Sequence, residues 1–86
     1  MKAINWFLYV ARCADGTLYT GVTTDIDRRL NEHNSGSKGA KYTKTRRPIT
    51  LVYSTAFKGR SEAQKAEYAF KRLTRKEKLK VIDANR

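Results

Sequence analysis

The pattern of hydrophobic and polar positions first predicts three short strands. Residues 5–12 and 18–22 are rich in aromatic and β-branched side chains, and residues 49–56 repeat that composition just after a proline. Because side chains alternate along a strand, the third segment should divide between two faces, with Leu51 and Tyr53 on one and Thr50 and Val52 on the other.

The first two strands are joined by Asp15-Gly16, the strongest turn signal in the chain. A two-residue turn there would place Tyr9 and Tyr19 on opposite faces of the hairpin. A three-residue loop, with Gly16 in the left-handed conformation, would pair Tyr9 with Gly21 and place both phenols on one face. We favour the three-residue loop, although the sequence alone allows either register.

A helix should follow the hairpin directly. Thr24 is a suitable N-cap with Asp27 as its capping-box partner, and the helix should end near Asn34, where Ser35 and Gly36 are stop signals. It would carry an apolar pair and, on a neighbouring strip, a polar pair, each spaced four residues apart: Ile26 with Leu30, and Arg29 with His33.

Two further helices are predicted in the last third of the chain. Residues 58–60 should turn the chain, Ser61 and Gln64 should cap the first helix, and its core-facing stripe would be Ala63, Ala66, Phe70 and Leu73. Thr74 and Glu77 should cap the second, which should run to about Ala84 and dock through Leu79 and Ile82. The expected fold is α/β (α+β), a three-stranded antiparallel sheet flanked by helices in the order β-β-α-β-α-α.

Length and composition suit one small intracellular domain. Eighty-six residues, 40% of them hydrophobic, can form one modest core, so we expect a single domain over residues 1–86 with its core at about 5–82. Cys13 is the only cysteine, which excludes an internal disulfide and a cysteine zinc site. The first apolar run is interrupted at Arg12, too early for a signal peptide or a membrane span. We expect a cytoplasmic monomer with no membrane association and no small-molecule cofactor.

Charge divides the chain into two unequal parts. The net charge is +11, yet residues 1–37 hold four Lys/Arg against four Asp/Glu, whereas residues 38–86 hold fifteen against four. Such a basic side indicates a polyanion partner, most often nucleic acid, because binding of phosphates releases counterions. A solvated face that keeps the protein soluble is the alternative. An anionic membrane is a weaker one, since no segment joins a broad apolar face to these cations.

Five of these cations, with no acidic residue among them, lie in residues 35–47, which we expect to form a basic loop with glycines at 36 and 39. Cations beside glycines, hydroxyls and an aromatic ring are suited to following a phosphate backbone and stacking on a base. A mobile surface loop is the alternative. The candidate nucleic-acid-binding residues are Lys38, Lys41, Tyr42, Lys44, Arg46 and Arg47.

Two tyrosines and an Arg/His pair could converge on one side of the sheet, although each has an ordinary structural alternative. Strand tyrosines commonly pack in cores, Arg29 could pair with Asp25, and His33 near a helix end could simply interact with the helix dipole. Glu67 lies at the edge of an apolar stripe, where it would either hold a cation or pair with Lys71 one turn later.

These positions, in this order, resemble the GIY-YIG nuclease domain. Phe7-Leu8-Tyr9 stands where the first named triplet would be and Tyr19-Thr20-Gly21 where the second would be, followed by Arg29, His33 and a glutamate on a later helix. The resemblance runs from about residue 5 to residue 82 and is strongest for small single-domain bacterial members of uncharacterised function. It implies that the first strand lies in the middle of the sheet.

The resemblance also implies hydrolysis of a phosphodiester with Mg²⁺ or Mn²⁺ and no covalent protein intermediate. Tyr19 would be the general base, which requires nearby positive charge because an unperturbed tyrosine has a pKa of about 10. Arg29 would supply that charge and hold the pentacovalent phosphate. His33 would hydrogen-bond the attacking-water network or accept a proton, Tyr9 would position water or a phosphate oxygen, and Glu67 would hold the metal ion.

The function expected from these features is a metal-dependent DNA endonuclease, structure-selective or weakly selective, with a role in repair or recombination. DNA is favoured over RNA as the partner. Val22 stands where many family members carry lysine, and a late asparagine that some carry is not matched. These departures support a non-catalytic DNA- or RNA-binding module on the same fold as the alternative; a small basic accessory of a larger ribonucleoprotein is a third hypothesis.

Overall fold

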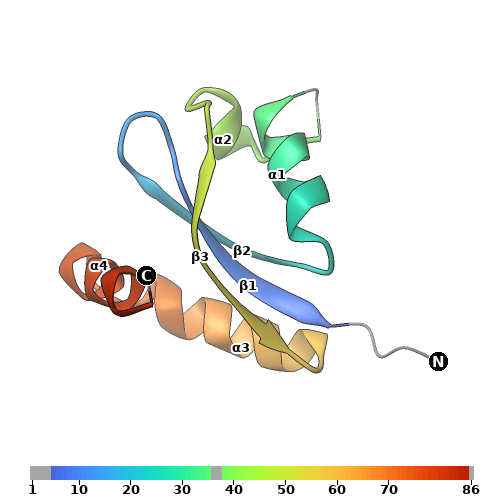
Figure 1. Ribbon diagram of the computed structural model, residues 1–86, viewed down its shortest axis with the longest axis vertical. Helices are drawn as coiled ribbons and strands as arrows, with labels where there is room; N and C mark the ends of the chain where they lie inside the picture. Colours follow the sequence, from blue (N-terminus) through green and yellow to red (C-terminus); the bar gives the residue numbers. More distant parts are fainter. Residues whose placement is uncertain (1–4, 36–37, 86) are drawn as a thin grey trace.

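The computed structural model describes residues 5–35 and 38–85, and the strands within them form one antiparallel sheet. The elements of these residues are, in chain order, β1 (Trp6–Arg12), β2 (Leu18–Thr23), α1 (Ile26–Asn34), α2 (Lys41–Lys44), β3 (Thr50–Phe57), α3 (Arg60–Lys71) and α4 (Arg75–Ala84). The sheet order is β2-β1-β3, so the first strand is central, as expected. α1 and α2 lie on one side of the sheet, and α3 and α4 on the other (Figure 1).

The hairpin between β1 and β2 has the three-residue loop. Gly16 adopts a φ of +86°, a conformation that costs glycine little because it has no Cβ. The register pairs Tyr9 with Gly21, which confirms the favoured alternative. Tyr9 and Tyr19 therefore share one face of the sheet, and α1 lies over that face.

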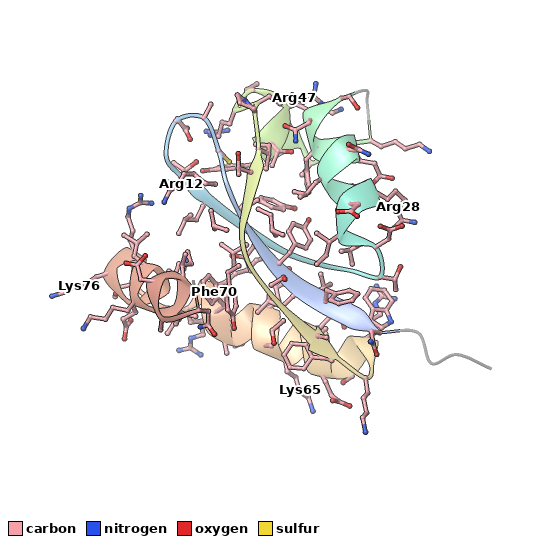
Figure 2. The ribbon with its side chains drawn as sticks, in the orientation of Figure 1. Arg12, Arg28, Arg47, Lys65, Phe70 and Lys76 are labelled. Atoms are coloured by element: carbon pink, nitrogen blue, oxygen red, sulfur yellow. The ribbon has the colours of Figure 1, made fainter. Side chains whose placement is uncertain are left out.

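Apolar side chains pack on both faces of β1, as alternation along a central strand requires. Beneath α3 and α4, the buried cluster is Leu8, Val10, Phe70 and Ile82. On the α1 side, a smaller cluster of Ala11, Cys13 and Ile49 packs with Tyr19 and Leu30. Figure 2 shows side chains from the sheet and from both helix layers filling the space between them. The predicted stripe on α3 is confirmed: Phe70 belongs to the larger cluster, Ala66 and Leu73 pack against it, and Ala63 is fully buried.

The start of α1 differs from the prediction by one residue. The Thr24 cap is wrong, because Asp25 is the N-cap and its side chain accepts a hydrogen bond from the Arg28 N–H at 3.0 Å. The Thr23 hydroxyl explains the shift: it accepts from the Asp25 N–H at 3.1 Å and so holds the preceding turn. The helix ends at Asn34 as expected, whereas Gly36 lies outside the described residues.

Two other expectations need correction. The Ser61 cap with Gln64 is wrong, because α3 begins two residues earlier, with Gly59 as an N-cap that offers no side-chain acceptor. The basic loop is not entirely irregular, because Lys41–Lys44 form the single turn of α2, with the Ala40 carbonyl accepting from the Thr43 and Lys44 amides.

An irregularity in β3 overturns the expected faces of the third strand. Tyr53 pairs with Val10 and Leu51 pairs with Ala11, so Val52 is the extra residue of a β-bulge. Val52 and Tyr53 consequently pack against the same cluster beneath α3 and α4, rather than on opposite faces. Strict alternation fails here because a bulge changes the side-chain phase by one residue.

The last helix is as predicted. The Thr74 side chain accepts from the Glu77 N–H, the Glu77 carboxylate accepts from the Thr74 N–H, and α4 runs to Ala84 with Ile82 buried. Among residues 5–35 and 38–85, no helix has the length and apolar character needed to cross a membrane.

Candidate active site

The Tyr9 side chain crosses from the central strand over the edge strand β2. This path is open because Gly21, its cross-strand partner, has no side chain: a Cβ there would lie 2.6 Å from Tyr9 Oη and 2.8 Å from Cζ. Such separations are well inside van der Waals contact, so any larger residue would displace the ring. The glycine of the second triplet therefore places the buried Tyr9 phenol over β2.

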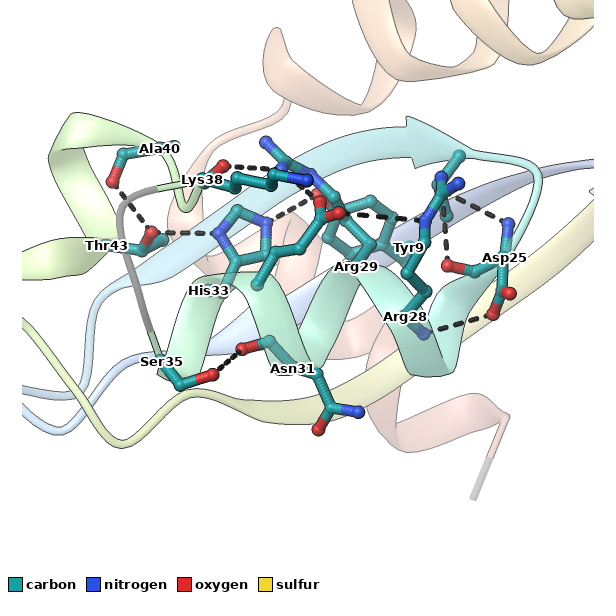
Figure 3. Close-up of polar contacts among 12 residues, drawn as sticks. Tyr9, Asp25, Arg28, Arg29, Asn31, His33, Ser35, Lys38, Ala40 and Thr43 are labelled. Carbon is teal, nitrogen blue, oxygen red and sulfur yellow. Dashed lines mark hydrogen bonds and ion pairs between the residues drawn. The ribbon is translucent and has the colours of Figure 1, made fainter.

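A chain of hydrogen bonds runs from this phenol to the basic segment. Tyr9 Oη lies 2.8 Å from His33 Nε2, and His33 Nδ1 lies 2.8 Å from Thr43 Oγ1, which lies 2.9 Å from the Ala40 carbonyl oxygen (Figure 3). The carbonyl can only accept, so the threonine hydroxyl donates to it and accepts from Nδ1–H. Nε2 is then the unprotonated nitrogen, which accepts from the Tyr9 hydroxyl. The geometry therefore fixes one tautomer of His33.

Burial keeps both ring systems uncharged. It raises the pKa of Tyr9 to about 12, with smaller upward contributions from the charges of Tyr19 and Glu67, while Arg29 beside the phenol acts in the opposite direction. Burial also lowers the pKa of His33 to about 4, helped by the positive charges of Arg29 and Arg47. At neutral pH a neutral phenol thus donates to a neutral imidazole.

Tyr19 connects this buried pair to the surface. Its ring centroid lies 5.0 Å from that of His33, in an edge-on arrangement, and 6.3 Å from that of Tyr9. On its other side it stacks with Tyr42 of α2, with centroids 6.2 Å apart. Tyr19 is half-buried, whereas Tyr9 and His33 are fully buried. Of the two predicted tyrosines, Tyr19 is thus the one that a substrate could reach.

Arg29 is held on the exposed side of the same cluster. Its Nη1 donates to Glu32 Oε1 at 2.8 Å and to the Lys38 carbonyl at 2.9 Å (Figure 3). Its partner is therefore Glu32 and not Asp25. Because Nη1 is committed to these acceptors, the guanidinium has a fixed orientation next to both tyrosines, on which its positive charge acts.

Glu67 approaches the cluster from α3. Its Oε2 lies 3.1 Å from Lys71 Nζ, so the ion pair one turn along the helix is present. The carboxylate is partly shielded, with 22% of its side chain exposed, and its charge acts on Tyr9. Within the described part of the chain, no three His, Cys, Asp or Glu side chains gather closely enough to share a metal ion.

A single carboxylate nevertheless fits one class of metal ion. Mg²⁺ commonly keeps several waters and is held by one or two carboxylates together with substrate phosphates. Glu67 offers one such oxygen set at a partly exposed position beside the aromatic cluster. The donor set therefore suits Mg²⁺ or Mn²⁺ bound jointly with a phosphate, and does not suit an ion held by protein groups alone.

The predicted nucleic-acid-binding residues have different roles within the molecule. Lys41 and Lys44 are exposed on α2, and Lys38 is exposed before it. Arg46 instead forms an ion pair with Asp15 and stacks over the Tyr42 ring. Arg47 donates to the carbonyl of His33 at 2.6 Å. The two arginines thus attach the basic segment to the hairpin loop and to α1, while the three lysines face solvent.

Thr43 is the member of the hydrogen-bond chain that sequence reasoning missed. It is fully buried although it lies in a run of exposed cations. A threonine between exposed cations gives little indication that it will be buried. The ten residues that separate it from His33 were predicted as loop, so the sequence did not indicate that the two side chains would meet. Its burial is visible only once α2 is packed against α1.

The chain is similar to known proteins over most of its length. The family model described as GIY-YIG catalytic domain matches residues 5–80. A UPF0213 protein of Streptococcus agalactiae is 55% identical over 82 residues, covering 95% of this chain and 92% of that protein. A UPF0213 protein of Desulfotalea psychrophila is 55% identical over 80 residues, covering 93% of this chain and 73% of the other.

Two solution NMR structures have the same fold. A UPF0213 protein of Bacillus halodurans superimposes with a TM-score of 0.61 at 46% identity, and a protein of E. faecalis with 0.64 at 48%. Each comparison covers 93% of this chain and 84% of the other. Since the family model spans nearly the whole chain and these relatives match at about half of their positions, the chain belongs to the GIY-YIG family.

Proposed function

We propose that the protein is a metal-dependent endonuclease that hydrolyses phosphodiester bonds in DNA. The observation that carries this proposal is the aromatic cluster: Tyr9, Tyr19 and His33 are in mutual contact beside a fixed guanidinium, on a chain with a net charge of +11. Neutral rings in a partly desolvated site, next to a cation, suit stabilisation of a pentacovalent phosphate.

Tyr19 is the general base in this proposal. It is the more accessible tyrosine, and the positive charge of Arg29 acts on it. The same guanidinium can hold a non-bridging phosphate oxygen, since Arg29 has donors beyond the Nη1 that contacts Glu32 and the Lys38 carbonyl.

Tyr9 and His33 have a supporting role in this proposal. Because the pKa of Tyr9 is raised to about 12 by burial, its hydroxyl stays protonated and donates its single proton to His33 Nε2. His33 holds that hydroxyl from behind through Nε2. The pair therefore helps to fix the position of the Tyr19 ring, which contacts both side chains, without itself removing a proton.

Glu67 would hold the divalent cation, which supplies Lewis acidity and stabilises the leaving oxygen when bound. The carboxylate must exchange Lys71 for that cation, which is feasible because the Lys71 side chain is exposed and surface ion pairs are worth little. Lys71 is then available to contact the substrate backbone.

The decisive experiment compares wild type with Glu67→Gln on labelled branched, flapped and plain duplex DNA, each in Mg²⁺, Mn²⁺ or EDTA. Glu62→Gln is the matched control, because Glu62 lies on the same helix, is exposed, and makes the same change in charge. We expect wild type and Glu62→Gln to nick DNA only with metal, and Glu67→Gln to bind without nicking. Cleavage retained by Glu67→Gln would refute the assignment.

The same experiment tests the alternative function. The Glu67–Lys71 ion pair and Val22, which replaces a lysine common in the family, favour a non-catalytic nucleic-acid-binding module. That module would bind in a salt-dependent manner and would produce no metal-dependent nicks at any protein concentration.

A further inference from the structure

A pocket opens at the free edge of β2, beside the aromatic cluster. Its volume is about 310 Å³, and it is lined by Leu18, Tyr19 and Thr20 of the strand, Tyr42 of α2, Lys71 of α3 and Lys78 of α4. Because neighbouring strand residues face opposite sides of a sheet, the pocket extends around the strand edge from the α1 side to the α3 side. Its helical lining residues come from both sides of the sheet in Figure 1, with Tyr42 on α2 on one side, and Lys71 on α3 and Lys78 on α4 on the other.

One wall of this pocket belongs to the proposed catalytic cluster. Tyr19 lines the pocket, and its ring also contacts His33, with centroids 5.0 Å apart. Lys71, on the opposite wall, forms an ion pair with Glu67. A group bound in the pocket would therefore lie next to the scissile phosphate.

Tyr42 presents a rigid aromatic surface to the pocket. Although Tyr42 stacks with Tyr19, 39% of the Tyr42 residue is exposed. The Arg46 guanidinium lies over the Tyr42 ring, 3.8 Å from the centroid. Arg46 is itself held by Asp15 at 3.1 Å and by the Tyr42 carbonyl at 2.8 Å. The orientation of the ring is thus set before any ligand arrives, which lowers the entropic cost of stacking.

The opposite wall is cationic. Lys71 and Lys78 line it from two different helices, and Lys78 is half-buried, with Nζ 5.9 Å from the centroid of the Phe70 ring. A pocket with aromatic rings on one side and ammonium groups on the other suits a single nucleotide. The flat base can stack on the rings while the phosphate contacts the ammonium groups.

We propose that this β2-edge pocket binds one unpaired nucleotide of the DNA substrate, with its base stacked on the exposed part of the Tyr42 ring beside Tyr19 and its phosphate held by Lys71 and Lys78. A base within a duplex is stacked on both faces and cannot offer one of them to a tyrosine, whereas a flap or junction nucleotide can. The pocket thus makes the enzyme selective for branched or flapped DNA. The inference rests on the proposed function only in placing the cut next to this pocket. Binding of the unpaired nucleotide does not depend on cleavage.

The test measures binding in EDTA, so that it is independent of cleavage. The probe is a duplex with a short flap whose first unpaired base is the fluorescent analogue 2-aminopurine, compared with the same duplex carrying 2-aminopurine in a base pair. Stacking on a tyrosine quenches this fluorophore. We expect quenching by wild type on the flapped probe alone, and its loss in Tyr42→Ala.

Affinity provides the second readout. Stacking of one base on an aromatic side chain predicts that Tyr42→Ala weakens binding to the flapped probe about tenfold and binding to the plain duplex less than about twofold. Tyr42→Phe should retain the preference. Tyr42→Leu preserves apolar bulk against Tyr19 and serves as a second variant if the alanine protein is unstable. An equal loss on both probes in Tyr42→Leu or Tyr42→Ala would overturn the inference.

The cationic wall has its own matched pair of variants. Lys78→Gln should reduce the slope of log affinity against log salt by about one for the flapped probe. Lys76→Gln is the control, because it makes the same charge change at an exposed position of α4 that does not line the pocket. A larger change in Lys76→Gln than in Lys78→Gln would contradict the assigned phosphate contact. Selective binding without any cleavage would refute the proposed nuclease and leave this pocket intact.

Discussion

The Tyr9 hydroxyl lies 2.8 Å from His33 Nε2, and both side chains are fully buried. This hydrogen bond joins the central strand to α1 across 24 residues of sequence. Because the threonine beyond the imidazole donates to a carbonyl, the direction of every bond in the chain is determined. The pair is therefore a neutral donor and a neutral acceptor, arranged to fix the position of an aromatic ring.

Replacing Thr43 with valine tests the hydrogen bond between Thr43 and His33. The His33 Nδ1–H would lose its acceptor, and a buried donor without a partner costs about 1–3 kcal/mol of the free energy of unfolding. Thr43→Ser should restore most of the stability, and Thr45→Val, at an exposed position of the same segment, should change it little. Chemical denaturation measures all three.

Nuclear magnetic resonance identifies the tautomer of His33 directly. The chain has one histidine, so a long-range ¹H–¹⁵N correlation spectrum contains a single imidazole. We expect a protonated Nδ1 and an unprotonated Nε2 in the wild type. A spectrum in which Nε2 carries the proton would show that the hydrogen-bond chain runs in the opposite direction.

Stability should fall as the solution becomes acidic, with His33 as a principal cause. Burial lowers its folded-state pKa to about 4, below its unfolded value, so the unfolded chain binds the extra proton first. The contribution is complete above about pH 6.5 and is lost as the pH falls toward 4, by about 2 kcal/mol between pH 7 and pH 5. Urea unfolding at several pH values measures it, and His33→Gln should flatten the profile. An equally steep profile in that variant would assign the effect to the carboxylates instead.

Gly21→Ala should disrupt the Tyr9 ring. The added Cβ would lie 2.6 Å from Tyr9 Oη, and the overlap should cost about 1–3 kcal/mol of the free energy of unfolding, with loss of any nuclease activity. A double-mutant cycle with Tyr9→Ala isolates the cause. Adding Gly21→Ala to Tyr9→Ala should cost much less than adding it to wild type; additive effects would mean that the glycine is needed for another reason.

Removing the ammonium beside Glu67 should strengthen metal binding. Lys71→Met frees Glu67 Oε2 from an ion pair of 3.1 Å, and because exposed pairs of this kind are weak, we expect Mn²⁺ affinity to rise only about two- to fivefold. Electron paramagnetic resonance of free Mn²⁺ measures it in the presence of a short DNA duplex, because the donor set suits an ion bound jointly with a phosphate. Lys65→Met, at an exposed position of the same helix, is the control. Unchanged affinity in Lys71→Met would argue against Glu67 as the ligand.

Much of the fold was predictable because it depends on local chemistry. Asp15-Gly16 and the alternation of the flanking residues predict the hairpin and narrow its register to two alternatives, of which the favoured one is confirmed. The Thr74/Glu77 capping box determines where α4 begins. The pairing of Glu67 with Lys71 follows from helical spacing alone. The position of β1 in the middle of the sheet came from the family resemblance and is confirmed.

The incorrect predictions involve choices that neighbouring residues leave nearly balanced. Thr24 and Asp25 are both good N-caps, and the Thr23 hydroxyl bond decides between them. The bulge at Val52 has no glycine or proline to indicate it.

In the candidate site, Tyr9, Tyr19, Arg29 and His33 were predicted as a set, and the structure brings them together, although their chemical roles stay predictions. Thr43 was missed because its burial depends on packing between two helices.

The central strand gives the protein an unusual relation between residue number and tolerance to substitution. Leu8 and Val10 belong to the cluster beneath α3 and α4, whereas Tyr9 and the residue that follows Val10 face α1 and the aromatic cluster. A saturation scan of β1 should therefore show two phenotypes with a period of two: changes at Leu8 and Val10 reduce only the amount of folded protein, whereas changes at Tyr9 also reduce any nuclease activity per folded molecule. The exposed lysines of α2 lie outside this strand, so the surface charge of the protein can change there while both sets of β1 positions stay the same.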